Sequence, residues 1–280
     1  MKNKLFPCLW FNGNAKQAAD LYSAAFGNTV VSEANSMVVM LEVEGCRIML
    51  LNGGPMFTPN PSISLFVTFN NEKDIDSAWN KLSDGGAVLM PINKYPWSDR
   101  YGWVQDQYGV SWQLMMVKPG LMEQKITPAL MFTRAVADKA EEAMALYTSL
   151  FPNSSIESIS RYEKGEGDVE GTVKHGRFSL EGQLFVAMDS SMAHAFSFSE
   201  GVSISVNCDT QEEIDHYWNS LTANGGEESM CGWLKDKYGV SWQIVPSMLG
   251  QLMSDPGKGQ RVMQALMKMK KLEIDKLVNA

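Results

Sequence analysis

Histidine is scarce in this sequence, and cysteine occurs without any metal-binding spacing. The 280 residues include three histidines, His175, His194 and His216. Divalent transition metals need several nitrogen, sulfur or carboxylate ligands at close quarters, so this composition argues against a histidine-rich metal centre. The four cysteines show no CxxC pair; they are Cys8, Cys46, Cys208 and Cys231. Scattered single cysteines are typical of reduced, partly buried thiols, which indicates a cytoplasmic protein.

The sequence also lacks an excess of basic charge and any long apolar run. Its net charge is -8 and its isoelectric point is near 5.0, whereas a nucleic-acid-binding domain would show a basic stripe. The N-terminal apolar run is too short for a signal peptide, and no stretch approaches the length of a membrane span. We therefore expect a globular cytoplasmic protein that has neither nucleic acid nor a membrane as a partner.

What the sequence does contain is a long internal repeat. The string GWVQDQYGVSWQLM, Gly102 to Met115, returns as GWLKDKYGVSWQIV, Gly232 to Val245. LYSAAFGN and LYTSLFPN correspond in the same way, as do IDSAWNKLSDGG and IDHYWNSLTANGG. One module has been duplicated and fused, and the differences in length between the copies are expected in loops.

The repeat sets the domain boundaries. We expect a first domain over residues 1–118, a linker over 119–127, a second domain over 128–248 and a helical tail over 249–280. The second copy has a longer middle, residues 161–176, and lacks most of the first copy's 91–101 segment. In the tail, Val262, Leu266 and Met269 form an amphipathic stripe, which predicts a helix docked on the protein's own core.

Each copy shows the same order of elements twice. An apolar strand precedes a helix with apolar residues at helical spacing, and three further strand-like runs follow; in the first copy the helices are expected at 15–26 and 72–83. The chain is thus βαβββ four times, an α+β fold. Two such units can pair their sheets into a half-open cup, and we expect each copy to close its own cup. The two copies would then pack as an intrachain pseudo-dimer, in a monomer or a homodimer.

The paired βαβββ order resembles the vicinal oxygen chelate superfamily, which includes glyoxalase, bleomycin-resistance protein and extradiol dioxygenases. WFNGNAKQAADLYSAAFGN, EGQLFVAMDSSMAHAFSF and CGWLKDKYGVSWQIVP look like the PhnB-like, or demethylubiquinone methyltransferase-like, group. The resemblance implies a tandem glyoxalase-like fold with two cup-shaped mixed sheets and a pocket for a small molecule. No Gly-rich loop of the kind used to bind S-adenosylmethionine is found, so methyl transfer is not expected.

The superfamily's metal site can be compared position by position. The resemblance places its last-strand ligand at Gln113 and Gln243, which carry uncharged amides. The first and fifth strands of each copy, where the family has further ligands, contain no histidine, aspartate or glutamate. We therefore expect no metal and no cofactor.

Strand alternation then selects the candidate ligand-binding residues. Ser111, Gln113 and Met115 share one face of their strand, and Trp112 points to the other, helix-covered face. The second copy repeats this arrangement with Ser241 and Gln243. A buried amide must find hydrogen-bond partners, so the glutamines favour a role in the cup. Trp103 and Trp233, on the preceding strands, either line the cups or fill the core.

The second copy carries the titratable candidates. His194, Phe196 and Phe198 alternate at period two, which would place them on one face at the mouth of the second cup. His194 is the candidate general base, with Asp189 or Glu200 as possible partners. Cys231 precedes the Gly-Trp strand and could reach the cup as a ligand contact, but no cationic neighbour indicates a nucleophile.

Three functions remain open. The first is a metal-independent protein that binds a small molecule, with Gln113, Gln243, Ser241, Phe196, Phe198, Trp233 and Cys231 as ligand contacts. The second is an enzyme that uses His194 as a general base. The third is a degenerate scaffold whose sheets serve assembly. Whether the protein is an enzyme, and which ligand it binds, does not follow from the sequence.

Overall fold

The computed structural model describes residues 4–118, 120 and 123–280. Part of the expected linker, residues 119, 121 and 122, and the first three residues of the expected first domain lie outside the described residues. The chain divides into two units. One is Pro7–Val202, and the other joins the N-terminal residues up to Phe6 to Ser203–Ala280. The units therefore do not coincide with the two sequence copies.

The elements of the described residues follow the fourfold βαβββ order. The strands are β1 (Leu5–Phe11), β2 (Thr29–Ala34), β3 (Val38–Val43), β4 (Cys46–Asn52), β5 (Ile63–Phe69), β6 (Ala87–Tyr95), β7 (Ser98–Gln105), β8 (Ser111–Met116), β9 (Ile126–Thr133), β10 (Ser155–Arg161), β11 (Val173–Leu180), β12 (Gln183–Ser190), β13 (Val202–Cys208), β14 (Glu227–Glu228), β15 (Trp233–Lys235) and β16 (Ser241–Pro246). The α-helices are α1 (Ala15–Phe26), α2 (Glu72–Ser83), α3 (Ala140–Leu150), α4 (Gln211–Thr222), α5 (Leu249–Ser254), α6 (Gly259–Leu266) and α7 (Ile274–Val278).

Local sequence signals explain where helices α2 and α4 begin. The side chain of Asn71 accepts a hydrogen bond from the amide of Asp74 (2.9 Å) and so caps α2. Thr210 caps α4 in the same way through the amide of Glu213 (3.3 Å). Acidic residues in the first turn of each helix favour its dipole. The predicted bounds of α1 and α2, 15–26 and 72–83, are confirmed.

The strands form two mixed eight-stranded sheets, as the α+β prediction required. One has the order β10-β11-β12-β9-β5-β8-β7-β6, and the other has the order β14-β15-β16-β13-β1-β4-β3-β2. The first lies wholly within Pro7–Val202. The strands of the second are divided between the two units.

The prediction that each copy closes its own cup is wrong. In the first sheet, β5 of the first copy pairs antiparallel with β9 of the second copy, and Ser64 lies opposite Ala129. The second βαβββ unit of the chain therefore shares a sheet with the third unit. A local pattern of strands and helices does not distinguish this pairing from the one expected, because both arrangements bury the same kind of strand edge.

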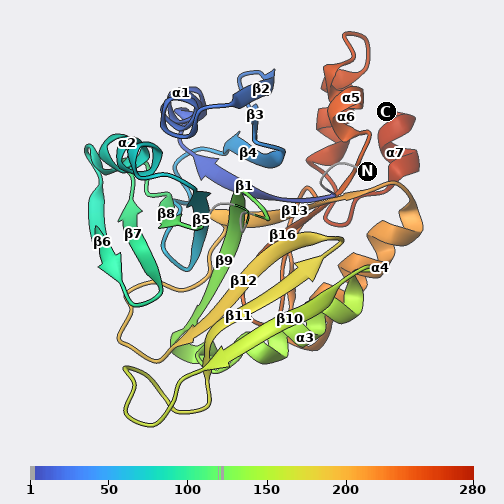
Figure 1. Cartoon of the computed structure of the whole chain (residues 1–280). Helices are drawn as coiled ribbons and strands as arrows, with labels where there is room; N and C mark the ends of the chain where they lie inside the picture. The colour runs from blue at the N-terminus through green and yellow to red at the C-terminus, as the bar shows by residue number, and fades with distance from the viewer. Residues whose placement is uncertain (1–3, 119, 121–122) are drawn as a thin grey trace. The chain divides into compact units, whose positions relative to one another are not determined.

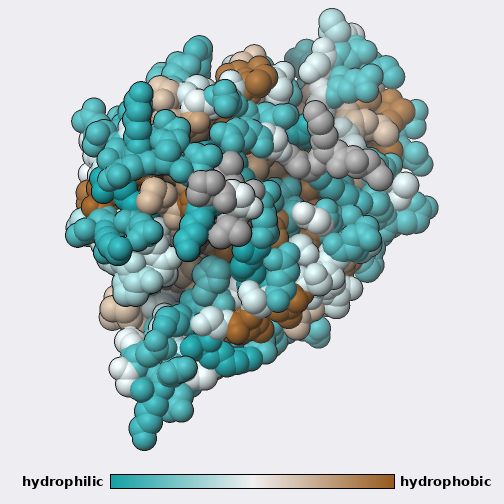
Figure 2. Space-filling view, viewed as in Figure 1, coloured by the Kyte–Doolittle hydropathy of each residue, from teal (hydrophilic) through white to brown (hydrophobic). Residues whose placement is uncertain are grey.

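Helices α2 and α3 cover one face of the sheet formed by strands β5 to β12, the β5–β12 sheet. α3 packs on β11, β12 and β10, and α2 packs on β7 and β8. In Figure 1, α3 lies along the far side of the β10–β12 strands. On the face shown in Figure 2, hydrophilic residues predominate and hydrophobic ones form small separate groups. Because α2 and α3 pack on one face of the sheet, its opposite face can form a binding site.

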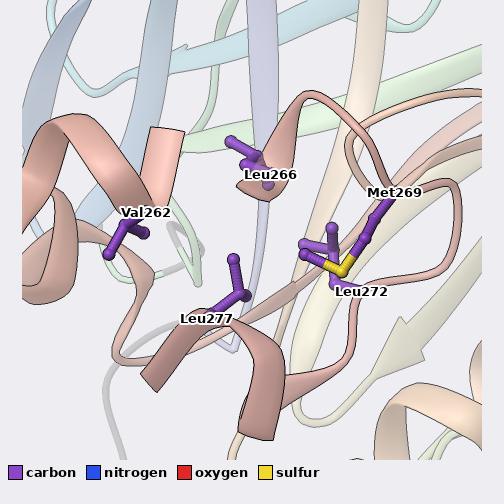
Figure 3. Packing of buried hydrophobic residues seen from close by; sticks show 5 residues of the cluster. All are labelled: Val262, Leu266, Met269, Leu272 and Leu277. Carbon is purple, nitrogen blue, oxygen red and sulfur yellow. The ribbon is translucent and has the colours of Figure 1, made fainter. Parts of the chain in front are cut away.

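The C-terminal tail packs on its own unit, as its amphipathic stripe predicted. Five buried side chains form the tail cluster, Val262, Leu266, Met269, Leu272 and Leu277 (Figure 3). Partly buried side chains that pack against this cluster include Cys231 and Val245. None of the helices in the described part of the chain has the length and apolar character needed to cross a membrane.

Candidate functional site: a cavity in the β5–β12 sheet

A cavity of about 790 Å³ opens on the face of the β5–β12 sheet that the helices leave free. Alternation along the strands builds its wall. On β8, Gln113 and Met115 line the cavity, whereas Trp112 is fully buried on the other face against Tyr22 and Phe26 of α1. The prediction that Trp112 packs under a helix is confirmed.

The cavity wall consists mainly of aromatic and methionine side chains. Its aromatic residues include Phe66, Trp97, Tyr101, Trp103 and Tyr162, and its methionines are Met90, Met115, Met131, Met188 and Met192. Rings supply large apolar area, and methionine adapts to irregular shapes. The lining therefore suits an apolar ligand without fixing one narrow shape.

The hairpin that joins β6 to β7 forms one edge of the cavity. Tyr95 stacks on Trp97 with ring centroids 5.1 Å apart, and each of these rings lies 5.6 Å from that of Tyr101. Trp97 is 58% exposed, although it lines the cavity, so this side chain lies where the cavity meets solvent. This hairpin contains the 91–101 segment, most of which the second copy lacks.

Gln113 has its amide committed to protein partners. Tyr101 donates its hydroxyl proton to the Gln113 Oε1 atom (2.5 Å), and Gln113 Nε2 donates to the Ser64 hydroxyl (2.7 Å). Burial, with a smaller contribution from Tyr95, raises the pKa of Tyr101, which therefore remains a donor. The amide oxygen at the position where the resemblance implies a metal ligand thus already accepts a hydrogen bond. Across the described ranges, no group of three or more histidine, cysteine, aspartate or glutamate residues could hold a metal ion.

The two basic residues of the wall have acidic partners. Lys174 pairs with Glu166. The Arg177 guanidinium reaches Glu123 (2.6 Å) and Glu157 (3.1 Å). In these pairs three carboxylates surround two cations, so the charge at this wall does not favour an anionic ligand.

His175 is a wall residue that the sequence analysis did not select. It lies on β11 opposite Ser160 of β10, and both line the cavity. Burial, and then the charge of Arg177, lowers the pKa of His175, so this imidazole is neutral at neutral pH. His175 and Arg177 are two residues apart on β11 and therefore lie on the same face of the sheet. This spacing was the signal available in the sequence.

His194 also lines this cavity, but the two phenylalanines predicted beside it do not. The ring of Phe196 lies 4.8 Å from that of His194, and Phe198 is buried against Phe132 (5.0 Å). The segment that carries them has no strand structure, so the period-two expectation does not apply to it. His194 Nε2 lies 2.8 Å from the hydroxyl of Ser190.

Asp189, one of the two partners considered for His194, has another task. Its Oδ1 accepts a hydrogen bond from the amide of Ala140 at the start of α3 (3.0 Å), and its Oδ2 accepts one from the amide of Val173 (2.9 Å). Burial outweighs these bonds and raises the pKa of Asp189. Asp189 therefore ties α3 to the sheet, as Asn52 ties α1 by accepting from the amide of Ala15 (2.9 Å).

The other candidate residues belong to the smaller unit. Gln243 donates to the Ser203 hydroxyl (2.9 Å), as Gln113 does to Ser64, and Ser241 lies opposite Ser203 on the neighbouring strand. Trp233 pairs with Gln243 across β15 and β16. The described lining of the cavity comes from Pro7–Val202 alone, so these side chains do not join His194 there.

Cys231 of the smaller unit is covered by the tail. Its amide donates to the carbonyl of Met269 (2.7 Å), and its sulfur lies 3.8 Å from that of Met267. Burial raises the pKa of the Cys231 thiol, which disfavours the reactive thiolate. Cys231 occupies the repeat position of Tyr101, which lines the open cavity in the larger unit.

This chain is a tandem glyoxalase-like protein built on a βαβββ repeat. It belongs to the family described as 3-demethylubiquinone-9 3-methyltransferase, whose model matches residues 3–115 and 124–245. The resemblance to the PhnB-like, or demethylubiquinone methyltransferase-like, group is thereby confirmed.

Two solved structures are similar to this chain. A PhnB protein from Bacillus cereus is 32% identical and covers 40% of this chain and 98% of its own, with a TM-score of 0.37. Glyoxalase I from Zea mays is 10% identical and covers 87% of this chain and 94% of its own, with a TM-score of 0.57. The latter likeness is one of fold. No curated protein matches the chain in sequence.

Proposed function

We propose that this protein binds a neutral, largely apolar small molecule in the cavity of the β5–β12 sheet, without the help of a metal ion. The observation that supports this is the cavity itself. Its volume of about 790 Å³ lies within the range of small-molecule sites, roughly 300–1,000 Å³. Its lining of aromatic rings and methionines matches the usual make-up of such sites.

The neutral character of the ligand follows from the charges in the wall. Lys174 and Arg177 are paired with carboxylates, and the lowered pKa of His175 leaves that ring uncharged. Three carboxylates, those of Glu123, Glu157 and Glu166, surround these two cations, so an anionic ligand would meet a net negative charge at this wall. A neutral ligand would leave the ion pairs in place and gain from burying apolar surface.

Independence from metal follows from the partners of Gln113. The amide oxygen at this position already accepts a hydrogen bond from the Tyr101 hydroxyl, and the described residues hold no group of three or more side chains that could bind a metal ion. A single amide oxygen also brings no charge to a divalent ion, which requires several ligands. A purely structural role for the sheet is less consistent with the cavity, because a large apolar surface open to solvent usually marks a binding site.

We do not propose methyl transfer, although the family description names it. A site for S-adenosylmethionine usually follows a strand of a doubly wound parallel sheet, and both sheets of this chain are mixed.

The scattered cysteines support a cytoplasmic location for the binding activity.

The proposal can be tested with 1-methoxynaphthalene, a neutral apolar probe without a hydrogen-bond donor. Equilibrium dialysis of the full chain should give saturable binding of one probe per chain. Met188→Glu places a charge in the wall and should weaken binding by at least about tenfold, equivalent to 1.4 kcal/mol. Met56→Glu is the matched control, because Met56 is 75% exposed and outside the described lining; it should bind normally. Binding that does not saturate, or that survives Met188→Glu unchanged, would refute the proposal.

A further inference from the structure

Most polar side chains in the cavity wall already bind other parts of the protein. Trp103 of β7 donates its indole N–H to the Ser111 hydroxyl of β8 (2.7 Å), and the amide of Gln113 is committed as described above. Near the start of β9, the Gln124 side chain donates to the carbonyl of Leu184 (3.1 Å) and accepts from its amide (3.0 Å). These hydrogen bonds hold neighbouring segments of the sheet together.

His175 and Ser160 differ from these groups. Both line the cavity, and neither side chain makes a hydrogen bond to any of the described residues or to the other. The sealed, unpartnered side-chain atoms of the described residues belong to Asn14, Ser205 and Ser241, so the ring nitrogens of the half-buried His175 remain accessible. Partly buried polar groups usually have a hydrogen-bond partner, and this pair is therefore open to a group of a ligand.

The packing of β11 on α3 shows which way His175 points. A Cβ placed on Gly176 would lie 2.7 Å from the side chain of Met144 on α3. Phe178 lies beside Tyr147 of the same helix, with ring centroids 6.4 Å apart. Gly176 and Phe178 therefore face α3, and the intervening alternation turns His175 to the opposite face, where the cavity opens.

Ser160 lies beside His175 on the neighbouring strand. The antiparallel register of β10 and β11 pairs Ser160 with His175 and Ile159 with Gly176. These two strands run side by side at one edge of the sheet (Figure 1). Residues that pair across two strands share one face of the sheet, so the Ser160 hydroxyl and the His175 ring border the same part of the cavity.

The two side chains together supply both kinds of hydrogen-bonding group. A neutral imidazole has one N–H donor and one lone pair, whichever nitrogen carries the proton, and a serine hydroxyl both donates and accepts. Burial, and then the charge of Arg177, lowers the pKa of His175, which keeps its lone pair available at neutral pH. A ligand hydroxyl matches this pair, because it can donate one hydrogen bond and accept another.

We propose that His175 and Ser160 are the polar anchor of the cavity and bind the hydroxyl group of an otherwise apolar ligand. This inference rests on the proposed function and narrows its ligand class to neutral apolar alcohols and phenols. The ligand hydroxyl donates to the unprotonated ring nitrogen of His175 and accepts from the Ser160 hydroxyl. The aromatic and methionine side chains of the wall contact the rest of the ligand.

Two probes that differ in one hydrogen-bond donor test the ligand class. 1-Naphthol carries a hydroxyl where 1-methoxynaphthalene has a methoxy group, and equilibrium dialysis gives the ratio of their dissociation constants for each protein. We expect His175→Phe to reduce the preference for 1-naphthol by a few-fold to about tenfold, as the loss of one neutral hydrogen bond predicts. Ser160→Ala should reduce it in the same direction. The matched control is Ser158→Ala, two residues earlier on β10 and outside the described lining, which should keep the parent ratio.

The ring nitrogens of His175 report on the contact in the parent protein itself. The chain has three histidines, so long-range ¹H–¹⁵N spectra can be assigned with His194→Gln and His216→Gln. We expect 1-naphthol to shift the His175 nitrogen signals more than 1-methoxynaphthalene does.

The outcomes separate this inference from the proposed function. If 1-methoxynaphthalene binds but the His175 signals stay in place at saturating 1-naphthol, the anchor is wrong and the proposed function still holds. The same conclusion follows if His175→Phe keeps the parent ratio of the two dissociation constants. If neither probe binds saturably, the proposed function fails, and the anchor fails with it.

Discussion

Trp112 donates its indole N–H to the carboxylate of Asp106 at 2.8 Å, and Trp242 makes the same bond to Asp236 at 2.9 Å. Each aspartate also accepts from the amides two and four residues later, so it closes the turn before the last strand of its repeat. Gly109, in the first of these turns, has φ +89°, where other residues are strained. Folding therefore explains why these aspartates and tryptophans recur in both copies, whereas Trp103, Gln113 and Met115 of the first string line the cavity.

Replacing Asp106 should be costly. The substitution Asp106→Ala leaves the buried donors of Trp112 and Tyr22 without their acceptor, and each unsatisfied group costs about 1–3 kcal/mol. We expect urea denaturation to show a loss of about 2–5 kcal/mol of unfolding free energy. Asp20→Ala removes an exposed aspartate paired with Lys16 and should change stability by less than about 0.5 kcal/mol. Equal effects of the two substitutions would show that the turn does not depend on Asp106.

The sequence predicted the elements well, because their signals are local. The bounds of α1 and α2 follow from apolar spacing and end signals within each segment. The partner of β5 is β9 of the other copy, and that choice depends on contacts between residues far apart in the chain. His194 and Gln243 were predicted to share the second cup, but His194 follows β12 of one sheet and Gln243 lies on β16 of the other.

The site was predicted in part for the same reason. Gln113 was assigned to a cup by alternation on one strand, and it lines the cavity. His175 was missed because the strand pattern does not show which face of β11 borders a cavity, and that cavity exists only in the folded chain. The roles of Gln113 and His194 in binding a ligand stay predictions.

The tail cluster should contribute strongly to the stability of its unit. Leu272 is fully buried, and a Cβ placed on Gly232 would lie 3.1 Å from its Cδ1 atom. We expect Leu272→Ala to lower the unfolding free energy by about 2–5 kcal/mol, the usual range for a buried leucine. Met267→Ala is the control, since Met267 is 61% exposed and should cost less than about 0.5 kcal/mol. A small loss for Leu272→Ala would mean that the tail is only loosely attached.

Metal content gives a prediction that concerns Gln113. Protein purified without chelator should hold far less than one zinc, iron or nickel ion per chain by elemental analysis, because the uncharged Gln113 amide has no group of metal-binding side chains beside it in the described residues. Gln113→Ala should leave the metal content unchanged and lower stability through the loss of the bonds to Tyr101 and Ser64. Stoichiometric metal that disappears in Gln113→Ala, and in the corresponding Gln243→Ala, would reverse this conclusion.

The last prediction concerns the pH dependence of stability that His175 causes. Burial and the charge of Arg177 lower the pKa of His175 in the folded chain, whereas the unfolded chain titrates near the ordinary value, about 6.5. Below that value the unfolded state binds more protons than the folded state, so the unfolding free energy falls as the pH falls. We expect His175→Gln, which does not titrate, to lose less stability than the parent protein between about pH 7.5 and pH 5.5, measured by urea denaturation.

The control is His216→Gln, at an exposed position on α4, which should follow the parent protein. If His175→Gln instead loses as much stability as the parent protein, the His175 ring is already free to take up its proton in the folded cavity, and the argument for a neutral wall would lose one of its supports.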